Sequence, residues 1–413
     1  MRKIILFILF ALTGTTIEAQ NFNDFFTDNT LRIDYTFAGN KQEQHIAVDQ
    51  LNAIPKWYGK RQHLSELPVE GNGQITVRTH STGKVIYRNS FSTLFQEWLS
   101  YDESKSISRS FENVFLVPMP KDTVEVTLEL RDNRRQVMAS LTHQVVPTDI
   151  LIRHIGEKDV TPYITLQQAA DTNRCIHLAF IAEGYTKDEM ATFIKDADIA
   201  VEAMFEHEPF KSMRDRFNII AVEAPSAESG TSEPAKGIWK NTALHSHFDT
   251  FYSDRYLTTL HLKDLHNWLA GTPYEHIIVL VNSSKYGGGG ILNSYNLTST
   301  HHLYYKPVVV HEFGHSFCGL ADEYAYEQED IPMYPHDIEP WEPNITTKVD
   351  FAKKWQDMLH KKDKAIGLYE GAGYSLKGVY RAYSDCRMRT NQNPEFCKVC
   401  QRALIRLINF YTK

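Results

Sequence analysis

The chain has little of what marks fibrous, disordered or nucleic-acid-binding proteins. Its 413 residues include 21 glycines and 16 prolines, too few for a collagen-like or low-complexity protein. Aromatic residues make up 12% of the chain, whereas disordered chains are poor in them. Its 44 basic residues do not outnumber its 51 acidic ones, so the basic surface that sequence-independent nucleic-acid binding requires is missing. We therefore expect a globular protein of two domains with no nucleic-acid partner.

Long hydrophobic runs are also missing. The run Ile4–Leu12 has nine residues, fewer than half of the ~20 that a membrane-spanning helix needs. Arg2 and Lys3 precede it, and small and polar residues follow as far as Ala19, which is the layout of a secretory signal peptide. We expect residues 1–19 to be removed after Ala19 and the protein to be exported without a transmembrane anchor. The sequence leaves open whether it stays in the periplasm or reaches the cell surface or the medium.

Cysteines are few, and they are unevenly placed. Three of the five lie close to the C-terminus, at Cys386, Cys397 and Cys400. Disulfides persist in the oxidising compartments that exported proteins enter. Three cysteines without a fourth cysteine or a histidine at ligand spacing make a weak zinc motif. We therefore predict a disulfide from Cys386 to either Cys397 or Cys400.

Residues 20–150 have the patterning of a β domain. Apolar and polar residues alternate over 124–130 and again over 137–141, with a turn-like Asp-Asn pair between them, which predicts a hairpin. One short helix is expected, over 94–99. Short strands at regular spacing are typical of a β-sandwich, and nothing in this half indicates catalysis.

The patterning changes between Pro147 and Pro162. Apolar runs over 175–181, 217–222 and 276–281 predict buried strands, and helical spacing of apolar residues predicts helices over 190–205 and 396–411. We expect an α/β domain over 163–413. The predicted fold class is thus α+β with two domains, a β-sandwich followed by a catalytic α/β domain.

The segment from Pro307 to Gly319 carries the chemistry. Proline suits the first turn of a helix and glycine its end, so the segment predicts one helix. His311 and His315 are one turn apart, and two imidazoles so placed can bind one zinc ion. Glu312 lies about 100° further round, where it can take a proton from water rather than bind the metal. The alternative is a pair of histidines on a solvated face, but the three valines before His311 indicate a buried helix.

Four stretches of sequence resemble the IgA-peptidase family of zinc metallopeptidases (metallopeptidase family sixty-four). They are HEFGHSFCGLADEY over 311–324, IAEGYT over 181–186, SGTSEP over 229–234 and FCKVC over 396–400. The first half also resembles the N-terminal domain of such proteins from gut bacteria. The resemblance implies a zinc endopeptidase in which His311 and His315 bind the metal and Glu312 is the catalytic base. The family name reflects an activity on immunoglobulin A, and the substrate of this chain stays open.

The wider metzincin pattern, H-E-x-x-H-x-x-G-x-x-H with a later methionine turn, is only partly matched. Gly319 falls one residue late, and Asp322 stands one residue late in place of the third histidine. We predict Asp322 as the third zinc ligand, with Glu323 as the alternative. Met388 is the candidate for the methionine turn, and the alternative is that it is an ordinary core methionine.

Two supporting roles are also predicted. Gly287 and Gly288 begin a run of four glycines that could form the rim strand on which an extended substrate lies, or else a mobile surface loop. Tyr380 or Tyr383, close to Met388, could stabilise the oxyanion.

The sequence therefore predicts an exported zinc endopeptidase that cleaves an extracellular or periplasmic protein. One alternative is a surface module that binds glycans or proteins and carries a degenerate peptidase domain, but the intact Glu312 speaks against it. The second alternative is a structural zinc protein. Two histidines and one acidic ligand leave a coordination position open, however, and structural sites avoid an open position. The oligomeric state is left open.

Overall fold

The first half of the chain forms two four-stranded sheets. The computed structural model describes residues 21–327, 333–359 and 363–413, and the expected signal peptide lies outside them. One sheet has the order β5-β1-β2-β8, with β1 Phe26–Gly39, β2 Gln44–Ile54, β5 Arg109–Pro120 and β8 Arg153–His154. The other has the order β4-β3-β6-β7, with β3 Gly73–Thr79, β4 Val85–Phe91, β6 Val124–Arg131 and β7 Val137–Val145. The predicted hairpin is confirmed, because β6 and β7 pair antiparallel.

The short helices α1 (Phe22–Phe25) and α2 (Leu94–Trp98) accompany these sheets. The helix predicted over 94–99 is confirmed as α2, whose N-cap Thr93 accepts a hydrogen bond from the backbone N–H of Gln96.

The second half is built on a six-stranded sheet of order β13-β14-β12-β10-β11-β9. Its strands are β9 Tyr163–Gln167, β10 Ile176–Glu183, β11 Phe217–Val222, β12 His276–Val281, β13 Gly288–Ile291 and β14 Tyr295–Ser299. The four inner strands are parallel, and the edge strands β9 and β13 are antiparallel to their neighbours. Every residue of β10 and β12 is buried, as their apolar runs predict.

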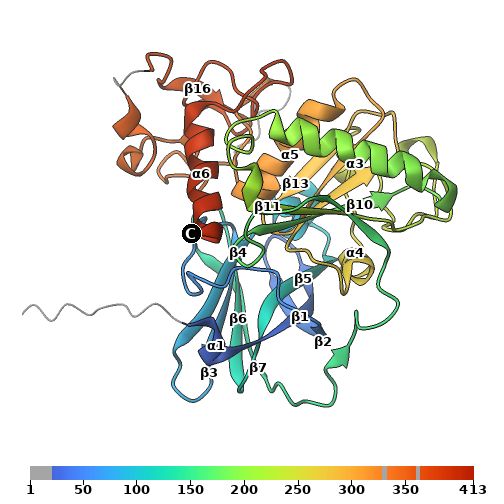
Figure 1. The fold of residues 1–413 in the computed structure, drawn as a ribbon. Helices are drawn as coiled ribbons and strands as arrows, with labels where there is room; N and C mark the ends of the chain where they lie inside the picture. Colours follow the sequence, from blue (N-terminus) through green and yellow to red (C-terminus); the bar gives the residue numbers. More distant parts are fainter. Residues whose placement is uncertain (1–20, 328–332, 360–362) are drawn as a thin grey trace, which may run out of the picture.

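Helices cover both faces of this sheet. They are α3 Met190–Phe205, α4 Leu262–Leu269, α5 Tyr305–Cys318 and α6 Lys398–Thr412. One apolar core joins a face of the sheet to α3, α5 and α6. In Figure 1, α3 and α5 lie above the sheet and α6 stands at its left-hand side. Thr186 and Glu189 form a capping box just before α3. A small three-stranded sheet, of order β15-β17-β16, precedes α6 and has strands β15 Ile345–Thr346, β16 Tyr369–Ala372 and β17 Ser375–Arg381.

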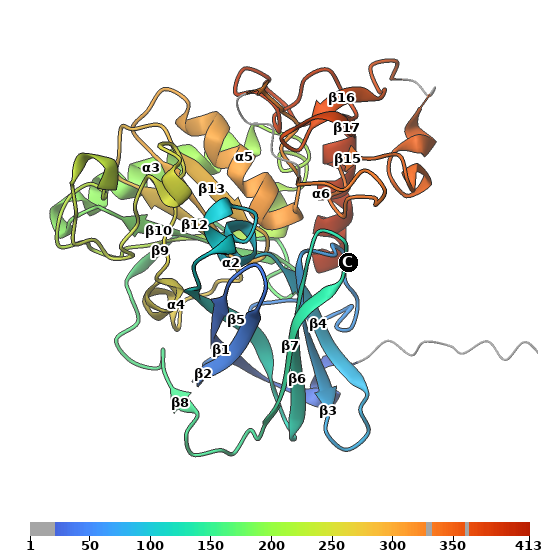
Figure 2. The same cartoon turned by 180° about the vertical axis from the view of Figure 1, so that it is seen from behind.

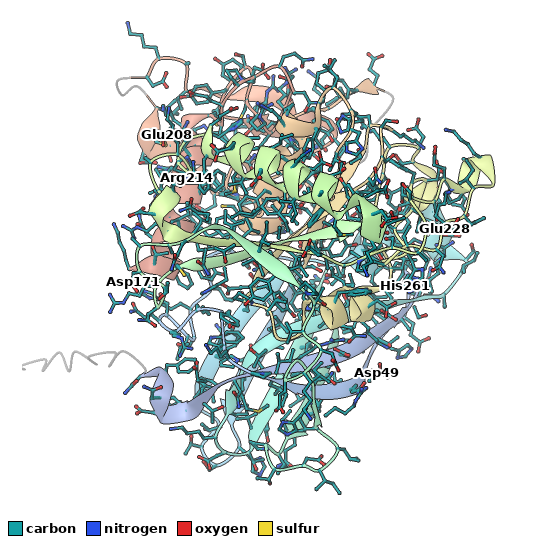
Figure 3. The ribbon with its side chains drawn as sticks, turned by 45° about the vertical axis from the view of Figure 1, so that its right-hand side comes forward. Asp49, Asp171, Glu208, Arg214, Glu228 and His261 are labelled. Carbon is teal, nitrogen blue, oxygen red and sulfur yellow. The ribbon has the colours of Figure 1, made fainter. Side chains whose placement is uncertain are left out.

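The opposite face of the six-stranded sheet packs on the N-terminal sheets. Alternate residues of the sheet, including Ile181 and Val279, share one apolar core with strands of both N-terminal sheets, which lie directly below in Figure 2. The buried Arg32 of β1 donates a hydrogen bond of 2.8 Å to the side chain of Asn267 in α4. Charged side chains such as Asp49, Asp171 and Glu228 are exposed at the surface (Figure 3). In the described part of the chain, no helix is long and apolar enough to cross a bilayer.

Candidate metal centre

Helix α5 presents one apolar face and one polar edge. Val310, Phe313 and Phe317 are each 1% exposed and pack into the core with α3 and α6. The helix begins two residues before Pro307, which therefore sits in the first turn, and it ends at Gly319, whose φ of 61° is left-handed. The predicted helix is thus confirmed.

The two histidines of α5 lie with their Nε2 atoms 3.0 Å apart. Nδ1 of His311 lies 3.0 Å from the carbonyl oxygen of Arg387, and Nδ1 of His315 lies 2.5 Å from that of Leu320. A carbonyl oxygen can only accept a hydrogen bond, so each Nδ1 carries the proton in the neutral imidazole. The two Nε2 lone pairs then face one another, an arrangement that calls for a cation between them.

Asp322 completes a triangle with these nitrogens. Its Oδ1 is 3.0 Å from Nε2 of His311 and 3.2 Å from Nε2 of His315. Ligands at 2.0–2.2 Å from a tetrahedral zinc ion lie about 3.3 Å apart. Two imidazoles and one carboxylate at these separations therefore suit a zinc ion.

The charges in this triangle are strongly coupled. Burial raises the pKa of Asp322, but the two imidazoles outweigh burial and hold this pKa well below its usual value. Burial lowers the pKa of His315, yet the facing Asp322 carboxylate raises it to about 9. Without a metal, a proton on His315 therefore takes the place of the cation.

Glu312 lies beside the triangle. One ligand atom from each of Glu312, His311 and His315 falls within a cluster 4.8 Å across. Burial raises the pKa of Glu312, and the positive charge of the imidazoles acts in the opposite direction. A carboxylate so placed can reach a water molecule that approaches the triangle, and its raised pKa suits exchange of a proton.

Glu323 does not belong to this triangle, although it follows Asp322 directly. Its carboxylate is fully buried on the other side of the loop. Oε1 accepts a hydrogen bond of 3.0 Å from the Asn344 side chain and lies 3.2 Å from Sγ of Cys400. Of the two alternatives for a third ligand, the structure brings Asp322 to the histidines.

Met388 lies under α5. Its side chain is fully buried, and its Sδ is 2.8 Å from the position that a Cβ on Gly314 would occupy. The adjacent residue, Arg387, supplies the carbonyl that orients His311. Met388 is therefore both a core methionine and part of the turn beneath the histidines.

The glycine run forms β13, next to α5, rather than a loop. A Cβ on Gly288 would lie 2.8 Å from Oε1 of Glu312. A Cβ on Gly287 would lie 2.4 Å from the Phe248 ring, and Tyr256 forms a parallel β-bridge with Gly288. These glycines let the chain's own helix and the segment around Tyr256 pack closely on the strand, and the role of the strand as a rim for an extended substrate stays a prediction.

The two tyrosines predicted from the sequence do not reach the histidines. The hydroxyl of Tyr380 donates to Glu370 over 3.4 Å, and that of Tyr383 donates to Asp363. A different tyrosine, Tyr374, contacts the triangle, because its hydroxyl donates a 2.6 Å hydrogen bond to Oδ2 of Asp322. Tyr374 adopts a φ of 60° directly after Gly373. The spacing between Tyr374 and Met388 in the sequence does not predict this contact.

The predicted disulfide is wrong in this structure. Sγ of Cys400 lies 3.8 Å from Sγ of Cys386 and 3.5 Å from Sγ of Cys397, whereas a disulfide needs about 2.05 Å. The pairing fails because three sulfur atoms and the Glu323 carboxylate converge on one point, so that no two sulfurs form an isolated pair.

Two family models together match almost all of the described chain. The family model described as IgA Peptidase M64 matches residues 164–365 and 360–408, and the model described as Peptidase M64 N-terminus matches residues 21–142. A search of curated proteins found no match. Among solved structures, the chain is similar to the crystal structure of metalloproteinase-II from Bacteroides fragilis, at 10% identity and a TM-score of 0.26, over 78% of this chain and 91% of that one.

Proposed function

The chain belongs to the IgA Peptidase M64 family of metallopeptidases, and from this premise we propose that it is a zinc-dependent endopeptidase. His311, His315 and Asp322 would hold the zinc ion, and Glu312 would be the catalytic base. The observation that carries the proposal is the convergence of three potential ligand atoms, two Nε2 and one Oδ1, within 3.0–3.2 Å of one another.

The proposed architecture is a β-sandwich over 20–150 followed by a metzincin-like catalytic domain over 163–413. Support for the first comes from the two four-stranded sheets that share a core. Support for the second comes from an antiparallel edge strand, β13, beside the helix that carries the histidines, and from a methionine beneath that helix. We also propose that the chain is exported and acts on a protein outside the cytoplasm. The support is the sequence of residues 1–19.

The zinc ion would supply Lewis acidity, lowering the pKa of water and polarising the scissile carbonyl. The residues of the chain then have separate tasks. Glu312 accepts a proton from the attacking water on its carboxylate and passes it to the nitrogen of the leaving amine. Arg387 and Leu320 hold the two imidazoles through their carbonyl oxygens, which fixes Nε2 as the free nitrogen.

Tyr374 has the task of a positioning residue. Its hydrogen bond to Oδ2 of Asp322 turns Oδ1 towards the histidines. Tyr324 contacts the hydroxyl of Tyr374 at 3.0 Å, and burial raises the pKa of both tyrosines far above the usual value. Both hydroxyls therefore stay protonated and able to donate at neutral pH.

The test is cleavage of a proteome-derived peptide library by the mature chain, with new termini identified by mass spectrometry. We expect internal cleavage that a chelator abolishes and that added zinc restores. The control is Tyr380→Phe, which alters a tyrosine away from the histidines. Metal-loaded protein that produces no new termini would contradict the proposal and favour a binding module with an inactive peptidase domain.

A further inference from the structure

A second cluster of metal-ligand side chains lies outside the proposed catalytic site. Glu323, Cys386, Cys397 and Cys400 each offer one ligand atom, and these four atoms all lie within 4.8 Å of one another. All four residues are buried, with Glu323 and Cys400 fully so. They come from three segments of the chain: the loop after α5, the turn that contains Met388, and the N-terminus of α6.

We propose that these four residues bind a structural zinc ion, separate from the one held by His311 and His315. Three thiolates and one carboxylate fill a tetrahedral site completely, and a closed site of this kind is structural rather than catalytic. Sulfur-rich tetrahedral sites select zinc over the harder divalent ions such as magnesium and calcium.

The separations between the sulfur atoms fit zinc. Tetrahedral thiolates at about 2.3 Å from zinc lie about 3.8 Å apart. The observed separations from Sγ of Cys400 are 3.8 Å to Cys386 and 3.5 Å to Cys397. Oε1 of Glu323 is 3.2 Å from the same sulfur. A disulfide would instead bring one pair of sulfurs to about 2.05 Å and leave the third unused.

Three further observations favour a cation at this point. Oε2 of Glu323 is buried and has no hydrogen-bond partner among the described residues, although an unpaired buried carboxylate oxygen is costly. The backbone N–H of Cys397 donates a 3.1 Å hydrogen bond to Sγ of Cys386, so one donor already points at a sulfur of the cluster. Cys397 is also the N-cap of α6, where the helix dipole favours a negative charge.

This site would fix the geometry of the catalytic one. Glu323 is the direct neighbour of Asp322, and its backbone N–H donates a 2.8 Å hydrogen bond to the carbonyl of Met388. Cys386 is the direct neighbour of Arg387, whose carbonyl orients His311. A zinc ion at the cysteines would therefore tie together the loop that carries Asp322 and the turn beneath the histidines.

The experiment first measures the total zinc content of the mature, full-length wild-type chain. An organomercurial then displaces metal from thiolates, and a dye detects the zinc that is released. We expect two zinc ions per chain, one of which the mercurial releases. His311→Ala should lower the count to one and leave the mercurial-released ion in place. Cys397→Ser and Glu323→Gln should remove the mercurial-released ion, whereas the control Cys175→Ser, at a cysteine outside the cluster, should remove none.

The wild-type measurement decides the question even if a cysteine variant fails to fold. No mercurial-released zinc from the wild-type chain would overturn the proposal. So would non-reducing peptide mapping that finds Cys400 in a disulfide with Cys386 or Cys397. Loss of peptidase activity alone would bear on the proposed function and not on this site, because the count does not depend on turnover.

Discussion

Asp322 and Glu323 are neighbours in the chain, but their carboxylates belong to two different clusters. Oδ1 of Asp322 lies 3.0 Å from Nε2 of His311, and Oε1 of Glu323 lies 3.2 Å from Sγ of Cys400. The left-handed Gly319 ends α5, and in the loop that follows the two consecutive side chains leave the backbone in different directions. One loop thus serves both proposed metal sites.

The two carboxylates should therefore be separable by substitution. We expect Asp322→Ala to lose the zinc ion that resists mercurial treatment, because the histidines alone leave the metal with two protein ligands. Glu323→Ala should lose the other ion and keep the one at the histidines. Zinc content after dialysis against a chelator measures both. Equal zinc retention by Asp322→Ala and the wild type would move the third ligand to another residue.

Tyr374→Phe should weaken zinc binding without abolishing it. The substitution removes the 2.6 Å hydrogen bond to Oδ2 of Asp322, and the loss of such an outer-shell partner typically costs about 10–100-fold in metal affinity or activity. Competition with a chromophoric chelator gives the affinity, with Tyr380→Phe as the matched control. An unchanged affinity in Tyr374→Phe would show that this hydroxyl does not orient the carboxylate.

Gly290 should be intolerant of a methyl group. A Cβ there would lie 2.5 Å from the backbone oxygen of Glu312 and 2.9 Å from Cβ of His315. Gly290→Ala must push β13 away from α5, and we expect it to lower the free energy of unfolding by about 1–3 kcal/mol. It should also lower kcat/KM for a peptide substrate, because the histidines move with the helix. Urea denaturation and turnover measure the two effects.

The control for Gly290→Ala is Gly367→Ala, where the nearest atom, on the Tyr369 ring, is 3.2 Å from the added Cβ. A flexible side chain can move by the few tenths of an ångström that this contact requires. If both variants matched the wild type in stability and turnover, β13 would not need its glycine.

Glu97 should make the protein less stable as the pH rises. The pKa of Glu97 is raised to about 7, and burial is the largest cause. The hydrogen bond from Tyr256 and the charge of His315 lower this pKa, whereas the charges of Asp322 and Glu312 raise it further. Because the folded state holds this proton to a higher pH than the unfolded state, its contribution to stability is complete below pH ~4.5 and is lost as the pH rises through about 7.

Glu97→Gln should remove this dependence and stabilise the protein above neutral pH by on the order of 1–2 kcal/mol. Urea midpoints on the acid and the alkaline side of pH 7 measure the difference, with the exposed Glu206→Gln as control. A midpoint difference between Glu97→Gln and the wild type that does not change with pH would contradict the assigned pKa.

Local patterns were enough to predict the helix that carries His311 and His315 and two strands of the sheet on which it packs. Strands β11 and β12 match the predicted ranges 217–222 and 276–281, because apolar runs of that length bounded by polar residues fit only buried strands. The end of α5 at Gly319 was also predictable, since glycine adopts the required left-handed φ without strain.

Contacts between distant segments could not be predicted in the same way. The place of Tyr374 depends on its positive φ after Gly373, and that of Glu323 depends on the direction of a loop. For a related reason, the sequence patterns did not predict that the two halves of the chain share one hydrophobic core. A strand buried on both faces, such as β10, does not reveal which element covers each face.

The most direct test of the central claim is the rate at which zinc-loaded Glu312→Ala cleaves a peptide that the wild-type chain is known to cut. Glu312 lies beside the histidines and is not needed to complete the triangle with Asp322. We therefore expect the variant to fold and to hold as much zinc as the wild type, while hydrolysis falls by several orders of magnitude, on the order of 10²–10⁴-fold or more. Cleavage by the zinc-loaded variant at close to the wild-type rate would contradict the assignment of Glu312 as the base and the proposed mechanism with it.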